Sequence, residues 1–395
     1  MTRARSTSLF VLSIASILTM APACKGGDQG KVGADKKAEG DKADEGDKAD
    51  KGGEADKGED AGAEAGKPGE WAWELPKGLS EPPPIPEDNP MSAEKVALGH
   101  QLFMDKRLSG DGSRSCYSCH QNELGNADGR KLALGAGDKP LTRNTPTIWN
   151  VGYHQKGLYW DGRAADLEAQ ALGAIKGGNM GVGADALAAK AKEIGALPEY
   201  AEQFTEVFGL EEGAEVEPDH VAKALSAYER TLLCGGTPYD EGELSESAKR
   251  GWDLFRGKAA CSVCHNGESF SDGIFHDVGL AYDDAGKLIE GADVGHGKPA
   301  GSEAENYKFR TPTLRNVAQT APYFHDGRTA TLEEAVRYMA AGGNAKAPTL
   351  DPNLRDTKLS DEEIADLVAF LEALDCPGEL EVIGDQKVEG IPEGA

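Results

Sequence analysis

Basic residues are outnumbered by acidic ones in this chain of 395 residues. Its 42 lysines and arginines face 68 aspartates and glutamates, which gives a formal net charge of −26 at pH 7. Recognition of nucleic acid needs a basic surface to meet the phosphates. The composition therefore argues against a nucleic-acid partner and favours attraction of a basic protein.

The N-terminal apolar run is too short to span a membrane. It extends from Leu9 to Met20, about a dozen residues, whereas a spanning helix needs about 20. Arg3 and Arg5 precede it and Ala-Pro-Ala-Cys ending at Cys24 follows it, which is the layout of a secretory signal. The small residues before Cys24 resemble the lipobox of bacterial lipoproteins, in which that cysteine is lipidated after cleavage.

We therefore expect residues 1–24 to be a lipoprotein-type signal peptide. The mature protein would be exported, in the periplasm or attached to the outer membrane, and would touch the membrane only through the lipid on Cys24. Lys25, in place of an aspartate, suggests the outer membrane. Ordinary secretion with an unpaired Cys24 is the alternative.

Apolar side chains are almost absent from residue 25 to about residue 70. This stretch repeats Gly, Ala, Lys, Asp and Glu, and such a composition cannot offset the entropy of ordering by burial. We expect residues 25–75 to be a disordered charged linker, either a tether or a solvated tail with no specific partner. Residues 379–395 are expected to be a tail.

No alternating pattern predicts a sheet of any size. Apolar residues recur instead at spacings of three and four, which is typical of helices. The predicted helices cover residues 93–104, 167–175, 184–192, 220–233, 247–255, 332–340 and 360–374. The last starts with a capping box from Ser360 to Glu363. The expected fold is mostly α, built from small helical domains joined near residues 235–245.

Two pentapeptides of the form Cys-X-X-Cys-His stand in the two halves. Two thiols at this spacing can bond the two vinyl groups of one haem, and the histidine that follows can ligate its iron. The expected cofactors are two covalently bound haem c groups. Their protein ligands would be Cys116, Cys119 and His120 for the first haem and Cys261, Cys264 and His265 for the second.

The anchors belong to an internal repeat. The string Thr-Pro-Thr-Ile-Trp-Asn-Val at 145–151 recurs as Thr-Pro-Thr-Leu-Arg-Asn-Val at 311–317, and Trp-Asp-Gly-Arg at 160–163 recurs as His-Asp-Gly-Arg at 325–328. We predict two tandem cytochrome c domains, 80–238 and 239–378, with one haem each. Cys234 and Cys376 lie near the two domain ends, and an oxidising compartment permits a disulfide between them. Two separately buried thiols are the alternative.

Over roughly residues 80–378 the chain resembles the bacterial dihaem cytochrome c peroxidases and their MauG-type relatives. The matching strings are Leu-Ser at 108–109, Asn-Thr-Pro-Thr at 144–147, Trp-Asp-Gly-Arg at 160–163, Phe-His at 275–276 and residues 311–327. The resemblance implies that hydrogen peroxide is reduced at the N-terminal haem. Electrons from a small cytochrome c or cupredoxin would reach the C-terminal haem, and members are often homodimers.

Met339 is the expected sixth ligand of the second haem. A thioether opposite histidine raises the potential, which suits a haem that accepts electrons. Met339 is the single methionine after the second anchor, and it keeps the family's spacing to Gly342 and Gly343. MauG-type enzymes have tyrosine there, and Tyr338 is out of register. A core methionine is the alternative.

The resemblance also places one tryptophan and one calcium ion between the haems. Trp160 would be the inter-haem relay, with plain packing as the alternative role. The calcium ligands would be the Asn144 side chain and the main-chain carbonyls of Thr320 and Pro322, completed by water, and hard oxygen ligands of this kind suit calcium.

The sequence departs from the family where peroxide is cleaved. Peroxidases of the family carry a distal glutamate and often a loop histidine, and here Asn179 and Ala136 occupy these positions. An amide can orient peroxide, but it cannot shuttle protons near neutral pH. The first haem is then either open to peroxide or ligated by Met180. The alternative function is a non-peroxidatic MauG-like oxidase or a pure electron carrier.

The remaining histidines are not at metal-ligand spacing, and packing or hydrogen bonding is the expected role of each. They are His100, His154, His220, His276, His296 and His325. His276 and His325 match family positions near the second haem and are candidates for bonds to its propionates. His154 is the one spare base near Trp160.

Overall fold

The computed structural model describes residues 71–211 and 213–377, which all belong to one compact unit. The predicted signal peptide with Cys24, residues 25–70 of the predicted linker and the predicted tail lie outside the described residues. The prediction of a disordered linker is wrong for residues 71–75, because Trp71 and Trp73 contact each other and pack against the core of the first half. Two indoles supply the apolar area that the rest of that segment lacks.

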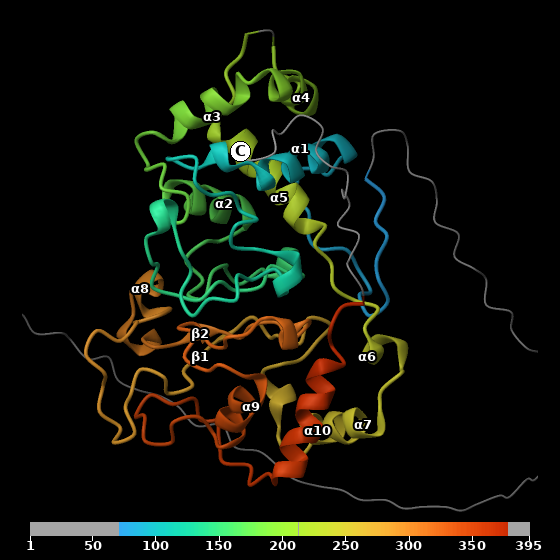
Figure 1. Cartoon of the computed structure of the whole chain (residues 1–395), viewed down its shortest axis with the longest axis vertical. Helices are drawn as coiled ribbons and strands as arrows, with labels where there is room; N and C mark the ends of the chain where they lie inside the picture. Colours follow the sequence, from blue (N-terminus) through green and yellow to red (C-terminus); the bar gives the residue numbers. More distant parts are fainter. Residues whose placement is uncertain (1–70, 212, 378–395) are drawn as a thin grey trace, which may run out of the picture. The chain divides into compact units, whose positions relative to one another are not determined.

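Helices dominate the described part of the chain (Figure 1), which confirms the mostly α prediction. They are α1 Ala93–Met104, α2 Leu167–Lys176, α3 Leu187–Gly195, α4 Pro198–Phe208, α5 Pro218–Arg230, α6 Pro238–Glu241, α7 Glu246–Arg256, α8 Gly297–Ala300, α9 Leu332–Ala340 and α10 Asp361–Glu372. The strands of the one sheet in this part are β1 Phe275–His276 and β2 Phe309–Arg310, which pair antiparallel. No helix among the described residues is long and apolar enough to cross a membrane.

One helix of more than two turns was not predicted. Helix α4 starts with Pro198, a good first residue because its missing N–H is not needed there. It buries Tyr200 and Phe204, which are four residues apart. This pair is a helical signal, but it is short and stands among charged residues.

Each half is built on one pair of crossing helices, α1 with α5 and α7 with α10 (Figure 1). A glycine lies at each crossing. A Cβ on Gly99 would lie 2.0 Å from the Ala224 carbonyl oxygen, and a Cβ on Gly251 would lie 1.9 Å from the Asp366 carbonyl oxygen. The helix backbones therefore touch at the equivalent place in both halves.

The two halves contact each other through a reciprocal pair of backbone hydrogen bonds. The N–H of Asn144 donates to the carbonyl of His325 at 2.8 Å, and the N–H of Arg310 donates to the carbonyl of Trp160 at 2.9 Å. In the repeat, Arg310 is the counterpart of Asn144 and His325 is the counterpart of Trp160. Each half thus gives a donor and an acceptor from equivalent positions, as in a two-fold contact.

The ends of the two halves are held in the same way. The side-chain oxygen of Asn150 accepts the N–H of Cys234 at 2.8 Å, and its counterpart Asn316 accepts the N–H of Cys376 at 3.0 Å. Cys234 and Cys376 form a disulfide with their Cα atoms 5.5 Å apart. The structure therefore has the predicted pairing, and it joins equivalent positions of the repeat.

Candidate functional site

Both Cys-X-X-Cys-His segments are tight loops that hold the histidine ring in one orientation. The Nδ1 of His120 lies 3.0 Å from the Asn126 carbonyl oxygen, and the Nδ1 of His265 lies 3.0 Å from the Phe270 carbonyl oxygen. Burial lowers the pKa of both histidines, which favours the neutral, ligating form. Nδ1–H bound to a carbonyl leaves Nε2 to face a metal, so both loops fit a haem iron.

The cysteines of both segments fit covalent haem attachment. Cys116, Cys119, Cys261 and Cys264 are free thiols in the structure, unlike the disulfide-bonded pair. Among the described residues, Cys264, Asp272 and His276 also form a group with metal-ligand atoms close together. Because Cys264 belongs to the predicted second anchor, we expect its sulfur to bond haem and do not assign this group as a separate metal site.

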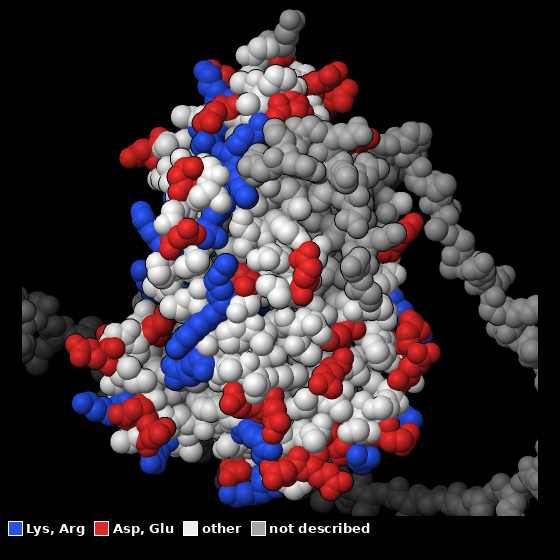
Figure 2. Space-filling view, in the orientation of Figure 1, with Lys and Arg blue, Asp and Glu red and all other residues white. Residues whose placement is uncertain are grey.

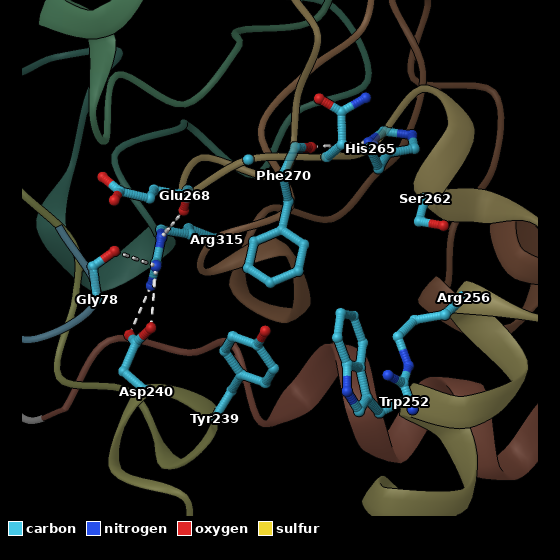
Figure 3. A pocket seen from close by; sticks show the side chains of 12 residues that line it. Gly78, Tyr239, Asp240, Trp252, Arg256, Ser262, His265, Glu268, Phe270 and Arg315 are labelled. Atoms are coloured by element: carbon cyan, nitrogen blue, oxygen red, sulfur yellow. Dashed lines mark hydrogen bonds and ion pairs between the residues drawn. The ribbon is translucent and has the colours of Figure 1, made fainter. Parts of the chain in front are cut away.

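A cavity of about 710 Å³ lies beside the second anchor. Figure 3 shows the rings of Tyr239, Trp252 and Phe270 along it, near His265. At its polar end the buried guanidinium of Arg315 bonds both carboxylate oxygens of Asp240, at 2.7 and 3.0 Å. The cavity thus combines an aromatic wall with a buried ion pair at one end, beside the histidine of the second anchor.

Met339 lies on α9, whose first turn has a capping box between Thr331 and Glu334. The adjacent Tyr338 is engaged elsewhere, since its hydroxyl donates to the Val278 carbonyl at 2.8 Å. This leaves Met339, not Tyr338, as the candidate ligand on the helix. Its ligation of the second haem stays a prediction.

The first half has no methionine at the equivalent position. Gly177 and Gly178 correspond to Gly342 and Gly343, so the residue three positions before the glycine pair is Ala174. Met180 lies on the other side of that pair. Its side chain is only 3% exposed and packs in the core cluster of the first half.

The two departures from the family pattern meet in space. After α2 ends, the N–H of Ala136 donates to the carbonyls of Gly178 and Asn179, at 3.2 and 3.0 Å. The next residue, Met180, accepts the N–H of Gly110 at 2.7 Å through its carbonyl. The loop that carries Asn179 and the loop that carries Ala136 are therefore hydrogen-bonded neighbours. The two positions where the family has a glutamate and a histidine hold an asparagine and an alanine instead.

Trp160 and the predicted calcium ligands also lie together. The indole N–H of Trp160 donates to the Asn144 carbonyl at 2.9 Å. The Asn144 side-chain NH₂ donates to the Arg130 carbonyl at 2.7 Å, which leaves its Oδ1 for other use. Within the described chain, the carbonyls of Thr320 and Pro322 accept no hydrogen bond. This donor set fits a hard cation, and the calcium site stays a prediction.

The other histidines have packing or hydrogen-bonding roles. His276 faces two carboxylates, Asp351 at 2.6 Å and Asp272 at 3.2 Å, so neither ring nitrogen is left for a propionate. His325 stacks on Phe309, with ring centroids 3.6 Å apart. Further contacts are those of His100 with Tyr228, of His220 with Phe208, of His296 with Phe275 and of His154 with Arg310.

The sequence of this chain is similar to those of known dihaem proteins over most of its length. Residues 93–248 match the family described as di-haem cytochrome c peroxidase, and residues 248–375 match the cytochrome c family. The chain is 41% identical over 300 residues to the methylamine utilization protein MauG of Methylorubrum extorquens, which covers 74% of this chain and 81% of that protein. It is 39% identical over 330 residues to the cytochrome-c peroxidase IdrP1 of Denitromonas iodatirespirans, which covers 76% and 86%.

A solved structure of a MauG-like protein associated with microbial copper homeostasis has the same fold. Its TM-score is 0.73 at 34% identity, and the match covers 80% of this chain and 99% of that one. The chain is a dihaem c-type cytochrome by fold and anchors. It belongs to the di-haem cytochrome c peroxidase family, which implies two haem c groups.

Proposed function

We propose that this protein reduces hydrogen peroxide at its first haem with electrons that enter at its second. The observation that carries the proposal is the difference between the halves at one equivalent position. The second half offers a thioether, Met339, where the first half has Ala174. A haem with histidine and methionine ligands suits electron transfer, whereas a haem with an open side suits peroxide.

Trp160 would connect the two haems. Its indole N–H and its backbone carbonyl are both held by hydrogen bonds, the second across the contact between the halves. A fixed ring at this contact supports the relay role. The electron donor would be a small cytochrome c or cupredoxin, with a basic surface that the net charge of −26 attracts.

The haem, when bound, supplies the electron exchange with peroxide. The residues around it must hold peroxide and supply the protons that water formation requires. Asn179 would orient peroxide through its amide. Proton delivery by the protein is the weak part of this site, because Asn179 and Ala136 carry no titratable group.

That weakness favours a second candidate function. Loss of the proton shuttle from both adjacent loops supports a non-peroxidatic dihaem protein, either an oxidase like MauG or a pure electron carrier. Ligation of the first haem by Met180 would give the pure carrier. The MauG names of two relatives are in keeping with this candidate.

We further propose export to the periplasm, attachment through a lipid on Cys24, calcium bound at Asn144, Thr320 and Pro322, and a homodimer. Export suits covalent haem attachment and the disulfide between Cys234 and Cys376, because disulfides persist in oxidising compartments. The net charge of −26 suits a basic protein partner better than nucleic acid. Figure 2 shows both Lys or Arg and Asp or Glu side chains on the face in view.

The test is stopped-flow mixing of the haem-loaded protein with hydrogen peroxide and reduced cytochrome c. Peroxide-dependent oxidation of the cytochrome is expected. If the cytochrome is not oxidised when peroxide is added, the peroxidase assignment is wrong. The pure carrier predicts a low-spin ferric spectrum for both haems. Met180→Ala should then abolish the low-spin spectrum of the first haem, whereas Met339→Ala should leave the first haem low-spin.

A further inference from the structure

Arg310 differs from the other buried arginines of the described chain. Arg114, Arg230, Arg310 and Arg315 are each 7% exposed or less. Three of them contact a carboxylate: Arg114 with Asp138, Arg230 with Glu168 and Arg315 with Asp240. Arg310 contacts no carboxylate of any described residue within 4.0 Å. It is a buried cation for which the described chain provides no counter-charge.

The groups that do touch its guanidinium are neutral. Nη1 donates to Nε2 of His154 at 3.0 Å, and Nε donates to the Tyr159 carbonyl at 3.4 Å. Burial, followed by the charge of Arg310, lowers the pKa of His154 well below its usual range, so the imidazole accepts this bond in its neutral form. Burial lowers the pKa of Arg310 to about 10, so the guanidinium still keeps its charge at neutral pH. A guanidinium has five N–H donors, and most of these have no acceptor in the described chain.

An unpaired buried charge is strongly unfavourable, and natural structures compensate it with an anion. Arg310 is well placed for one particular class of anion. Its backbone N–H bonds the carbonyl of Trp160. The carbonyl of the next residue, Thr311, accepts the hydroxyl of Ser271 at 2.6 Å, and Ser271 directly follows Phe270, whose carbonyl holds the His265 ring. Arg310 therefore lies between the halves, beside the predicted relay and next to the segment that supports the second haem's histidine. Each haem c carries two propionates, which remain ionised beside a guanidinium.

We propose that Arg310 binds a propionate of one of the two haems, with His154 orienting the guanidinium. Arg310 is thus a cofactor-binding residue at the contact between the halves. His154, the spare base near Trp160, is a positioning residue for it. The proposal depends on haem attachment alone and stands or falls independently of peroxide chemistry.

The test is a spectroelectrochemical titration of both haems between pH 5.5 and 8. Arg310→Gln removes a positive charge beside a haem, which stabilises the ferric state, so the potential of that haem falls. The same change raises the pKa of the propionate, so the potential becomes pH-dependent and falls further as the propionate ionises. Arg310→Lys keeps the charge and restores a pH-independent potential. The haem that responds identifies whose propionate is bound.

The matched control removes another buried arginine together with its acid. Arg230→Gln combined with Glu168→Gln deletes a buried pair with no change in net charge, and both haem potentials should keep their pH profile. If the potentials of both haems are unchanged in Arg310→Gln, the proposal is wrong. Should Arg310→Gln lose haem, resonance Raman spectra of the wild type and Arg310→Lys decide instead. The propionate bending band shifts if the guanidinium is its partner, and an unchanged band overturns the proposal.

Discussion

Asn179 is the residue on which the proposed chemistry of the first haem depends. Its carbonyl accepts the N–H of Ala136, so the two positions that lack the family's acid and histidine are direct neighbours. A substitution at one of them therefore acts close to the other.

Asn179→Glu should raise the rate of peroxide-dependent donor oxidation by about 10²-fold, because a positioned general acid or base contributes 10²- to 10⁴-fold. The measurement is the initial rate in stopped flow at fixed peroxide and saturating donor. Asn179→Gln is the control, since it keeps an amide and should give no gain. A fully haem-loaded Asn179→Glu variant with the parent rate would contradict the assigned position.

Sites formed by consecutive residues could be predicted from the sequence, whereas sites formed by residues far apart in the sequence could not. The haem anchors need only five consecutive residues, so the sequence alone indicated them. Asn179 needed the family resemblance. Arg310 was missed because the signal is the lack of a carboxylate around it, and that is visible only once the two halves are folded together.

At the scale of elements, the crossing helices set the geometry of each half. Gly251 of α7 faces the backbone of α10 so closely that a single added methyl would meet the Asp366 carbonyl oxygen at 1.9 Å. The helices would have to move apart, and the apolar contacts of Phe255 with Phe370, whose rings are 5.1 Å apart, would loosen with them.

Gly251→Ala should therefore lower the free energy of unfolding by about 2 to 3 kcal/mol, the upper part of the usual cost of overpacking. Urea unfolding followed by circular dichroism measures it. Lys249→Ala, on the exposed face of the same helix, should cost under about 0.5 kcal/mol. If Gly251→Ala and the wild type have equal free energies of unfolding, the backbones of α7 and α10 are further apart at this crossing than the structure shows.

The predicted bounds agree with the structure for α1 and α9. The start of α3 was placed three residues early, since Ala184 to Ala186 continue the apolar spacing but are not helical. Strands β1 and β2 have two residues each, which is too short for any periodicity. Both lie in the second half and pair with each other, so the folding of that half brings them together, not a local preference of either segment.

At the scale of the whole molecule, the disulfide ties the two halves at their ends. It closes a loop with a sequence separation of 142 residues. The double substitution Cys234→Ser with Cys376→Ser should lower the free energy of unfolding by about 3 to 5 kcal/mol, because a long loop gains chain entropy when released. Urea titrations measure the free energy of unfolding. The single substitutions, which leave one free thiol, show whether exchange of that thiol affects the result. An unchanged midpoint would show that the bridge does not constrain the unfolded chain.

The charge of the whole chain gives a prediction about partners. At −26 it should accelerate encounters with a basic donor and slow those with an acidic one. The rate of oxidation of a basic cytochrome c should fall as NaCl rises from 20 to 300 mM in a stopped-flow series, because screening shortens the range of attraction. An acidic cytochrome should show a weaker or opposite dependence. A rate with the basic donor that ignores salt would argue against electrostatic steering.

The reciprocal bonds from Asn144 to His325 and from Arg310 to Trp160 use backbone atoms only. Such a contact places no demand on the four side chains, so each half can specialise while the joint between them stays the same. This accounts for the pairing of an asparagine with an arginine and of a tryptophan with a histidine at equivalent positions. The backbone contact between the two repeats stays symmetric, while the side chains at its four positions, 144, 160, 310 and 325, can differ in chemistry.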